Sequence, residues 1–249
     1  MDIRDAFRVL VSSRANEQRP VDFSVSVPTF SMRECSQVQM LGAGSFGQVF
    51  TCIYGNEKYV LKQMHVDVER MMGPSLYQKE LRLLESLKGH PNVVGIRGYC
   101  YNERAFMLDY HRFSFQCLEI DCRPVSSLDR LLILCHEYTH FVGCKHLQVN
   151  IAVDVASGLQ YLHSKDIVHR DLKSENILVC NRHYTDDNAE YGCDRVWPYR
   201  PVVCKLTDFG ESRSSTVRTR INATATRTRN VARGSLVYRA PESFKQVGR

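Results

Sequence analysis

A glycine-rich run between two strand-like segments is the feature that most constrains the fold of this chain. Residues 41–49 read Leu-Gly-Ala-Gly-Ser-Phe-Gly-Gln-Val, which places three glycines in a G-x-G-x-x-G-x-V pattern. In a dinucleotide-binding fold the third glycine opens a helix. Here Gly47 is instead followed by alternating β-branched residues that end at Gly55-Asn56, a hairpin signal. The run therefore predicts a loop between antiparallel strands, in which backbone N–H groups can approach a phosphate, although the same glycines also occur in ordinary turns.

Hydrophobic periodicity predicts an α+β chain in two parts. A strand-like stretch covers 37–62 and is broken by the Gly55-Asn56 turn, with the strand after the turn covering 59–64. Further strands are predicted over 93–98, 105–110, 177–179 and 202–206, and helices over 75–87, 128–134 and 147–163. In the last helix Ile151, Val155, Leu159 and Leu162 fall on one face. We therefore expect a mostly antiparallel sheet with one helix, followed by a more helical part.

Composition excludes several classes of protein. No apolar run approaches the roughly 18 residues of a membrane-spanning helix, and the acidic first five residues lack the apolar segment of a signal peptide. Ten cysteines occur without any C-x-x-C pair, which favours reduced, structural thiols and a reducing compartment over a disulfide framework or a zinc site. We therefore expect a cytoplasmic protein with no membrane segment.

The positive net charge is local. The chain carries 33 Lys and Arg against 27 Asp and Glu, a net charge of +6. Residues 211–233 hold six arginines and one acid, so that this segment alone contributes +5. The remainder has no general basic face for a phosphate backbone, which argues against nucleic acid as a partner.

Ionisable residues in the second half of the chain form two short motifs suited to phosphate chemistry. The run 169–176 reads His-Arg-Asp-Leu-Lys-Ser-Glu-Asn, in which Asp171 can accept a hydroxyl proton and Asn176 offers a neutral oxygen to Mg²⁺. Asp208-Phe209-Gly210 follows a predicted strand and adds a carboxylate. In the first half, Lys62 ends a strand and Glu80 lies on the next helix; each alone is most often a surface charge, but together they can pair.

These motifs, taken in order with Ala240-Pro241-Glu242, resemble those of a eukaryotic protein kinase, of the serine/threonine type and closest to the tyrosine-kinase-like group. The resemblance covers roughly 35–249 and implies a bilobal kinase fold. Its N-lobe, an antiparallel sheet with one helix, would span about 35–109, and a mainly helical C-lobe about 110–249. Residues 1–34 would form an N-terminal extension or cap. Because the family usually continues well past the A-P-E motif, the C-lobe is expected to be incomplete here.

The resemblance assigns a role to each motif residue. Lys62 would contact the ATP phosphates and pair with Glu80, Asp171 would deprotonate the substrate hydroxyl, and Lys173 would steady the transferring group. Asn176 and Asp208 would hold Mg²⁺. The residues implied around ATP are Leu41, Gly42, Ala43, Gly44, Ser45, Phe46, Gly47, Gln48, Val49, Val60, Lys62, Asp109, His111 and Leu178, with Leu108 as the gatekeeper.

Three functional alternatives follow from this reading. Lys173, two residues after the catalytic Asp171, and Gly234-Ser235 before the A-P-E motif resemble the serine/threonine type. A tyrosine or dual-specificity kinase remains an alternative, as does a pseudokinase or truncated kinase-fold binding module. The presence of Lys62, Asp171, Asn176 and Asp208 favours an active enzyme with ATP and Mg²⁺ as cofactors and a protein as substrate.

Regulation is expected in the arginine-rich segment between the D-F-G and A-P-E motifs. The resemblance makes this segment an activation loop, with Thr226 or Thr228 phosphorylated by an upstream kinase and the phosphate held by Arg170. Two stretches, 112–126 and 181–201, are insertions relative to the family, and we expect them to be tolerated surface loops.

Overall fold

A five-stranded sheet organises the first of two units into which the chain divides. The computed structural model describes residues 25–44, 47–65, 75–115, 123–137, 145–181, 202–214 and 236–238. Unit 1 comprises Met1–Gly89 and Val94–Tyr110, and unit 2 comprises His90–Val93 and His111–Arg249. The predicted amphipathic start of the N-terminal extension lies outside the described residues, as do Ser45, Phe46, Thr226, Thr228 and the A-P-E motif.

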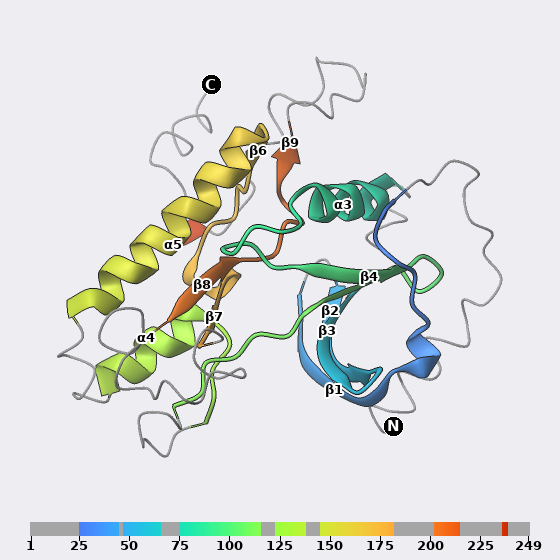
Figure 1. Cartoon of the computed structure of the whole chain (residues 1–249), viewed down its shortest axis with the longest axis horizontal. Coiled ribbons are helices and arrows are strands. Elements are labelled where there is room, and N and C mark those ends of the chain that lie inside the picture. Colours follow the sequence, from blue (N-terminus) through green and yellow to red (C-terminus); the bar gives the residue numbers. More distant parts are fainter. Residues whose placement is uncertain are drawn as a thin grey trace. The chain divides into compact units, whose positions relative to one another are not determined.

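The sheet of unit 1 is antiparallel throughout. Its strands are β1 (Ser36–Ala43), β2 (Gly47–Tyr54), β3 (Glu57–Met64), β4 (Ile96–Cys100) and β5 (Ala105–Asp109), in the order β1-β2-β3-β5-β4 (Figure 1). Gly55 and Asn56 both have positive φ, 56° and 68°, as a two-residue hairpin with the twist of its strands requires. The predicted hairpin is therefore confirmed.

The strand register gives the two faces of this sheet different partners. Directly opposite residues point to the same face, so the pairs Phe50↔Leu61 and Leu61↔Met107 put these three side chains on one side. They form a core with residues that precede the sheet, Phe30 and Met32, the latter in the 3-10 turn η1 (Met32–Glu34). Residues at the end of the predicted N-terminal extension thus cap this core.

Part of the opposite face of the sheet is covered by α3 (Ser75–Ser86). Lys62 and Phe106 face each other on this side. The Tyr77 ring of α3 stacks on Phe106 with centroids 4.8 Å apart and planes 5° apart. Its hydroxyl donates to the backbone oxygen of Cys100 at 3.0 Å, so the buried phenol keeps a hydrogen-bond partner. This stack fixes α3 against the strand that carries Lys62.

The described part of unit 2 combines two α-helices with two small antiparallel sheets. Its elements are α4 (Leu128–Glu137), α5 (Lys145–Ser164), β6 (Ile167–Val168), η4 (Ser174–Asn176), β7 (Ile177–Cys180), β8 (Val203–Leu206), β9 (Arg213–Ser214) and η6 (Leu236–Tyr238). β7 pairs with β8, and β6 pairs with β9. Every predicted strand and helix after residue 110 is present, with ends that differ from the prediction by at most three residues.

The edge of β8 that does not face β7 is satisfied by residues of other elements. The Asp154 carboxylate of α5 accepts a hydrogen bond from the backbone N–H of Cys204 at 2.8 Å. The Asn92 side chain donates to the oxygen of Cys204 at 3.0 Å, and its backbone oxygen accepts from Leu206 N at 2.9 Å. A Cβ at Gly158 of α5 would lie 2.8 Å from the same Asn92 oxygen. Glycine there lets the helix approach β8 closely.

The buried face of α5 differs in part from the predicted one. Ile151, Val155 and Leu159 are only half-buried, whereas Asp154 and Gly158 are buried. Leu147 and Leu162 complete the buried face, and Val149 and Val153 are 58% and 56% exposed. The reason is that the helix is apolar on more than one side, so periodicity could not decide which side packs against β8.

The start and end of the first insertion are joined. Phe113 and Val125 exchange two backbone hydrogen bonds of 2.6 and 3.0 Å. Phe113 and Phe115 are buried and pack edge to face, with centroids 5.0 Å apart. The Asn181 side chain, where the second insertion begins, donates to Ser114 O at 2.7 Å. The described ends of both insertions are thus part of the core of unit 2.

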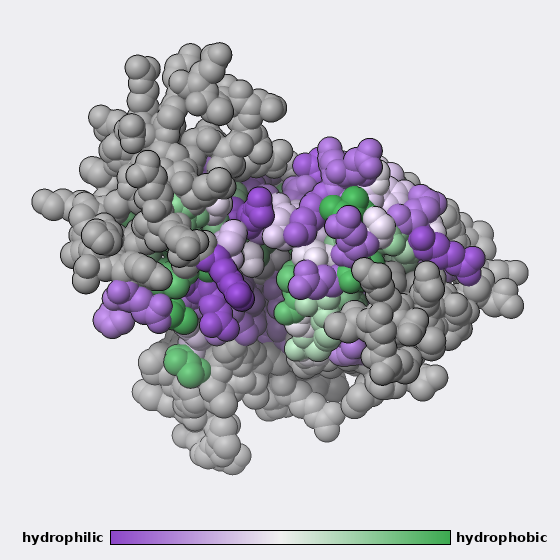
Figure 2. Space-filling model, turned by 90° about the horizontal axis from the view of Figure 1, so that it is seen from below, coloured by the Kyte–Doolittle hydropathy of each residue, from purple (hydrophilic) through white to green (hydrophobic). Residues whose placement is uncertain are grey.

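The described surface is mixed in polarity. On the face drawn in Figure 2, hydrophilic and hydrophobic side chains are interspersed over the described residues. Among the helices that the structure describes, none has the length and apolar content needed to span a membrane.

Candidate active site

The glycines of the glycine-rich run serve different structural purposes. Ala43 pairs with Gln48 where β1 ends and β2 begins, and Gly44 N donates to Gly47 O at 2.8 Å. A Cβ at Gly47 would overlap the backbone oxygen of Gln63, so packing within the sheet requires glycine there. A Cβ at Gly42 or Gly44 would have no atom within 4 Å. Packing against the described residues therefore does not require glycine at these two positions, and their backbone is open to a ligand.

Lys62 and Glu80 form the predicted ion pair. Lys62 Nζ lies 2.7 Å from Glu80 Oε1, and the two side chains are 12% and 5% exposed. β3 supplies the lysine and α3 supplies the carboxylate, so the stacking of Tyr77 on Phe106 also positions this pair. An unpaired charge at this depth would be costly, so the Lys62 ammonium group stays beside the Glu80 carboxylate and is oriented by it.

Apolar residues predicted around ATP lie near Lys62 in unit 1. Val49 faces Lys62 across β2 and β3, and Val60 faces Leu108 across β3 and β5. Val49 and Val60 are half-buried, and Leu41 is 54% exposed. The Lys62 face of the sheet thus combines a cation with apolar surface that solvent can still reach.

The remaining residues predicted around ATP lie near the ends of strands. Asp109 is the last residue of β5 in unit 1, and its carboxylate pairs with Arg97. His111 and Leu178 belong to unit 2, where His111 is 5% exposed and Leu178, on β7, is half-buried.

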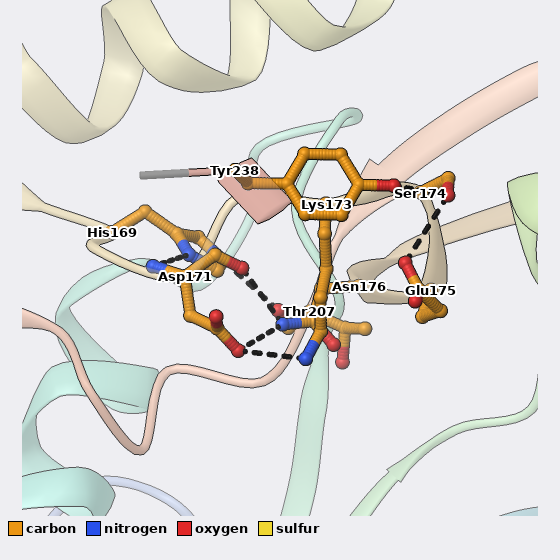
Figure 3. Close-up of polar contacts among 8 residues, drawn as sticks. All are labelled: His169, Asp171, Lys173, Ser174, Glu175, Asn176, Thr207 and Tyr238. Carbon is orange, nitrogen blue, oxygen red and sulfur yellow. Dashed lines mark hydrogen bonds and ion pairs between the residues drawn. The ribbon is translucent and has the colours of Figure 1, made fainter. Parts of the chain in front are cut away.

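Asp171, Lys173 and Asn176 meet in one cluster of unit 2 (Figure 3). One carboxylate oxygen of Asp171, Oδ2, lies 3.1 Å from Lys173 Nζ and accepts from Asn176 Nδ2 at 3.0 Å. Asn176 Nδ2 also donates to the backbone oxygen of Asp171 at 2.8 Å. These contacts fix the carboxylate, which remains 13% exposed. The arrangement provides an oriented general base beside a cation.

His169 joins this loop to the Asp208 segment. Its Nε2 lies 3.0 Å from Thr207 O, and its Nδ1 lies 3.4 Å from the backbone nitrogen of Asp171. Both contacts are satisfied by the neutral tautomer that carries its proton on Nε2. The His169 ring packs against Phe209 with centroids 5.2 Å apart, and Ser212 Oγ donates to His169 O at 3.0 Å.

Two residues of this region adopt a left-handed backbone conformation without being glycine. Arg170 has φ 71° and Asp208 has φ 61°. They adjoin the hydrogen-bonded residues His169 and Thr207, and Thr207 N donates to Asn176 O at 3.1 Å. Such conformations cost on the order of 1 kcal/mol or more and persist where surrounding contacts hold them, often at functional sites.

The donor set in unit 2 fits Mg²⁺. Both hydrogen bonds of the Asn176 side chain in the described structure use Nδ2, which leaves its carbonyl oxygen Oδ1 for a cation. The Asp208 segment is hydrogen-bonded to Asn176 through Thr207, and Asp208 adds a carboxylate. Carboxylate and amide oxygens are the ligands that Mg²⁺ prefers. No group of three or more His, Cys, Asp and Glu side chains arranged for a metal occurs among the described residues.

The structure shows a further residue beside this cluster. The Tyr238 hydroxyl lies 3.3 Å from Ser174 Oγ, next to Lys173 in Figure 3. Tyr238 is 54% exposed. Tyr238 was not predicted from the sequence as a site residue. Its position between the D-F-G and A-P-E motifs, just before the latter, could have indicated it.

Comparison with known proteins assigns the family. Residues 35–248 match the model of the protein kinase domain. This chain belongs to the protein kinase family. It is 30% identical over 196 residues to human mitogen-activated protein kinase kinase kinase 10, covering 76% of this chain and 17% of that protein. The predicted likeness to eukaryotic kinases of the tyrosine-kinase-like group is thereby confirmed.

Other relatives are also kinases. The dual specificity protein kinase splA of Dictyostelium discoideum is 30% identical over 210 residues, which cover 83% of this chain and 8% of that protein. Bovine interleukin-1 receptor-associated kinase 1 is 28% identical over 222 residues, which cover 86% of this chain and 26% of that protein. This kinase chain therefore spans about a quarter or less of the length of these three relatives.

Proposed function

We propose that this chain is an ATP- and Mg²⁺-dependent protein kinase that phosphorylates serine and threonine. The observation that carries the proposal is the Asp171 carboxylate, held by Lys173 at 3.1 Å and Asn176 at 3.0 Å beside the Asp208 segment. A carboxylate fixed in this way can receive a proton from a hydroxyl group. The domain match supports protein kinase activity as the reaction class.

In unit 1, ATP binding is proposed for the Lys62 face of the sheet. The open backbone at Gly42 and Gly44 lies over the phosphates, and the Lys62 ammonium, oriented by Glu80, contacts the α- and β-phosphates. Val49 and Val60 cover one side of adenine. The remaining proposed contacts come from Leu41, Ala43, Ser45, Phe46, Gly47, Gln48, Asp109, His111 and Leu178.

Proton transfer is the step that Asp171 performs in this proposal. A substrate hydroxyl attacks the γ-phosphorus of ATP, its proton passes to the Asp171 carboxylate, and the bond to the ADP oxygen breaks. Lys173 offsets the negative charge that spreads over the transferring oxygens. Asn176 and Asp208 would hold Mg²⁺, which supplies further positive charge against the phosphates. Each side chain thus stabilises charge that is largest in the transition state.

Serine/threonine specificity is favoured by Lys173, whose ammonium contacts Asp171. The printed name of the splA relative, a dual specificity kinase, supports the alternative that tyrosine is also phosphorylated. A pseudokinase is the third candidate, and the cluster around Asp171 argues against it, because a binding module has no need of an oriented base.

Transfer from γ-³²P-labelled ATP to a generic protein substrate, followed by phosphoamino-acid analysis, tests the proposal. We expect phosphoserine and phosphothreonine, and a loss of rate on the order of 10² to 10⁴ in Asp171→Asn. Glu175→Gln is the matched control, because Glu175 is exposed and the contact of its carboxylate among the described residues is with its neighbour Ser174. Phosphotyrosine among the products would favour dual specificity. Full activity in Asp171→Asn would refute the assigned base, and no transfer by the wild type would favour the pseudokinase.

Regulation by phosphorylation of the activation loop is a separate part of this proposal. An upstream kinase would phosphorylate Thr226 or Thr228, and Arg170 would bind the phosphate. Thr226 and Thr228 lie outside the described residues. Alanine at both threonines should prevent activation by an upstream kinase, and unchanged activation would contradict this mechanism.

A further inference from the structure

An ion pair holds the last residue of β5, where the chain leaves the sheet of unit 1. Arg97 Nε lies 2.5 Å from Asp109 Oδ1, and its Nη2 donates to Asp109 Oδ2 at 3.4 Å. The Arg97 side chain is 49% exposed, whereas that of Asp109 is only 15% exposed. A two-point contact between guanidinium and carboxylate fixes the direction of the carboxylate as well as its distance. Asp109 is thus anchored by a residue of the neighbouring strand, β4.

Gly95 makes room for this carboxylate. A Cβ at Gly95 would overlap Asp109 Oδ2, so no other residue could stand there without moving the Asp109 side chain. The backbone is fixed at the same point, because Asp109 N donates to Gly95 O at 2.9 Å. The backbone and side chain of Asp109 therefore both have one defined position in unit 1.

Neighbouring charges reinforce the anchor. The hydrogen bond to Asp109 raises the pKa of the Arg97 guanidinium above its ordinary value. Tyr59 on β3 lies opposite Asp109, and its hydroxyl donates to the Glu57 carboxylate. This hydrogen bond, together with burial, raises the pKa of Tyr59 to about 12. A second cation acts on the next residue, since Lys58 Nζ lies 4.4 Å from the centre of the Tyr110 ring. Two cations of the sheet thus hold two consecutive residues at the end of β5.

We propose that Arg97 is a positioning residue that sets the affinity of this kinase for the adenine end of ATP without touching the nucleotide. The proposal rests on the proposed function, in which Asp109 and His111 contact ATP. Because the Asp109 carboxylate is occupied by Arg97, Asp109 offers the base its backbone groups rather than its side chain. A base edge is recognised by backbone hydrogen bonds only when the backbone is held in place. Removing Arg97 lets that segment move and weakens adenine binding, while Lys62 and the glycine-rich run still hold the phosphates.

The test is nucleotide binding and steady-state kinetics of Arg97→Gln. We expect the Kd and KM for MgATP to rise about three- to five-fold, the order of magnitude that a partly exposed ion pair contributes. The kcat should stay within about two-fold, since Asp171 and its neighbours are unchanged. The inhibition constant of magnesium tripolyphosphate, which carries phosphates but no adenine, should not change. A merely structural role would instead alter kcat, or both nucleotide and tripolyphosphate binding.

Three further variants make the result decisive. Arg97→Lys keeps the charge but loses the two-point contact, so its KM should lie between those of the wild type and Arg97→Gln. Gly95→Ala displaces the Asp109 carboxylate without touching Arg97, and should raise the KM by a similar factor. Arg33→Gln removes an exposed arginine of η1 and is the control, with no change expected. Thermal unfolding of each variant shows that the fold persists.

The outcomes separate this inference from the function on which it rests. If the wild type binds no MgATP, the proposed function fails. If the wild type binds MgATP and Arg97→Gln binds it equally well, the function stands and the positioning role of Arg97 is refuted. Equal weakening of ATP and tripolyphosphate binding would also refute it, because the effect would then not be confined to the adenine end.

Discussion

Replacement of Asp154 should destabilise unit 2, because a buried backbone N–H group loses its acceptor. The Asp154 carboxylate accepts a hydrogen bond from Cys204 N at 2.8 Å. Asp154 and Cys204 are each 1% exposed. In Asp154→Ala this N–H group loses its acceptor in a place that water does not reach. In Asp154→Leu the volume is refilled, but the acceptor is still missing. In Asp154→Asn the amide oxygen can accept in place of the carboxylate.

The magnitude follows from the acceptor alone. A buried donor left without a partner costs about 1–3 kcal/mol. The better helix propensity of alanine returns roughly 0.6 kcal/mol in α5. We therefore expect Asp154→Ala and Asp154→Leu to lower the free energy of unfolding by about 1.5 kcal/mol, and Asp154→Asn by less than about 1 kcal/mol. All three substitutions remove the buried charge of Asp154. This does not reverse the order of the three stabilities, because the Cys204 N–H group remains buried in every variant.

Chemical denaturation followed by circular dichroism measures these differences, with Asp129→Ala in α4 as a control for loss of an acid from a helix. A difference of about 1.5 kcal/mol should also lower the unfolding midpoint by roughly 4 °C. Equal stability of Asp154→Ala and Asp154→Asn would refute the reasoning, since the two variants differ in the acceptor. A more stable Asp154→Leu would show that burial of the charge dominates instead.

Three other expectations can be checked in the same preparations. Gly47→Ala should lower the free energy of unfolding by about 1–3 kcal/mol through overlap with Gln63 O, whereas Gly44→Ala should leave unfolding unchanged and raise the KM for ATP. Burial, followed by the hydrogen bond with Glu103, raises the pKa of Cys100 from 9.0 to about 12. The stabilisation present below about pH 9 is therefore lost as the pH rises towards 12, by about 1 kcal/mol between pH 9 and 10, and Cys100→Ala should not show this loss. Lys62→Met should reduce phosphoryl transfer by about 10² or more while the protein still unfolds cooperatively.

Local signals in the sequence predicted most elements of the fold. The alternation after Gly47 and the Gly55-Asn56 pair specify a hairpin through neighbouring residues only, and the structure has it with both turn residues at positive φ. The ion pair between Lys62 and Glu80 was predicted because the two residues belong to motifs of known order. Features that depend on one element or one motif could therefore be predicted from the sequence.

Contacts between distant elements were not accessible from the sequence. Asp154 is 50 positions from Cys204, and Asn92 is 112 positions from it, so nothing in the local pattern links these residues. The pair of Arg97 and Asp109 depends on the register of β4 against β5, which a bulge shifts between Ile96 and Gly98. These long-range contacts decide how β8 and the end of β5 are held, and hence where the predicted functional residues beside them lie.

The left-handed conformations of Arg170 and Asp208 are the clearest case in which tertiary contacts override local preference. Single-residue propensity favours glycine, asparagine or aspartate in this region, so Arg170 at φ 71° is a larger departure from local preference than Asp208 at φ 61°. The two residues adjoin His169 and Thr207, whose contact of 3.0 Å fixes both segments relative to each other. The strain at Arg170 and Asp208 is offset by this contact, so we expect it to relax when the contact is removed.

His169→Phe separates the hydrogen bonds of His169 from its packing. Phenylalanine keeps a ring against Phe209, where the centroids are 5.2 Å apart, but loses the contacts of Nε2 with Thr207 and of Nδ1 with Asp171. If the hydrogen bonds hold the strained turns, kcat should fall about five-fold and the unfolding midpoint by roughly 3 °C, because a net hydrogen bond contributes about 1 kcal/mol. His169→Ala, which also loses the packing, should lower both further. An unchanged kcat in His169→Phe would show that the ring against Phe209 is sufficient to hold Arg170 and Asp208 in place.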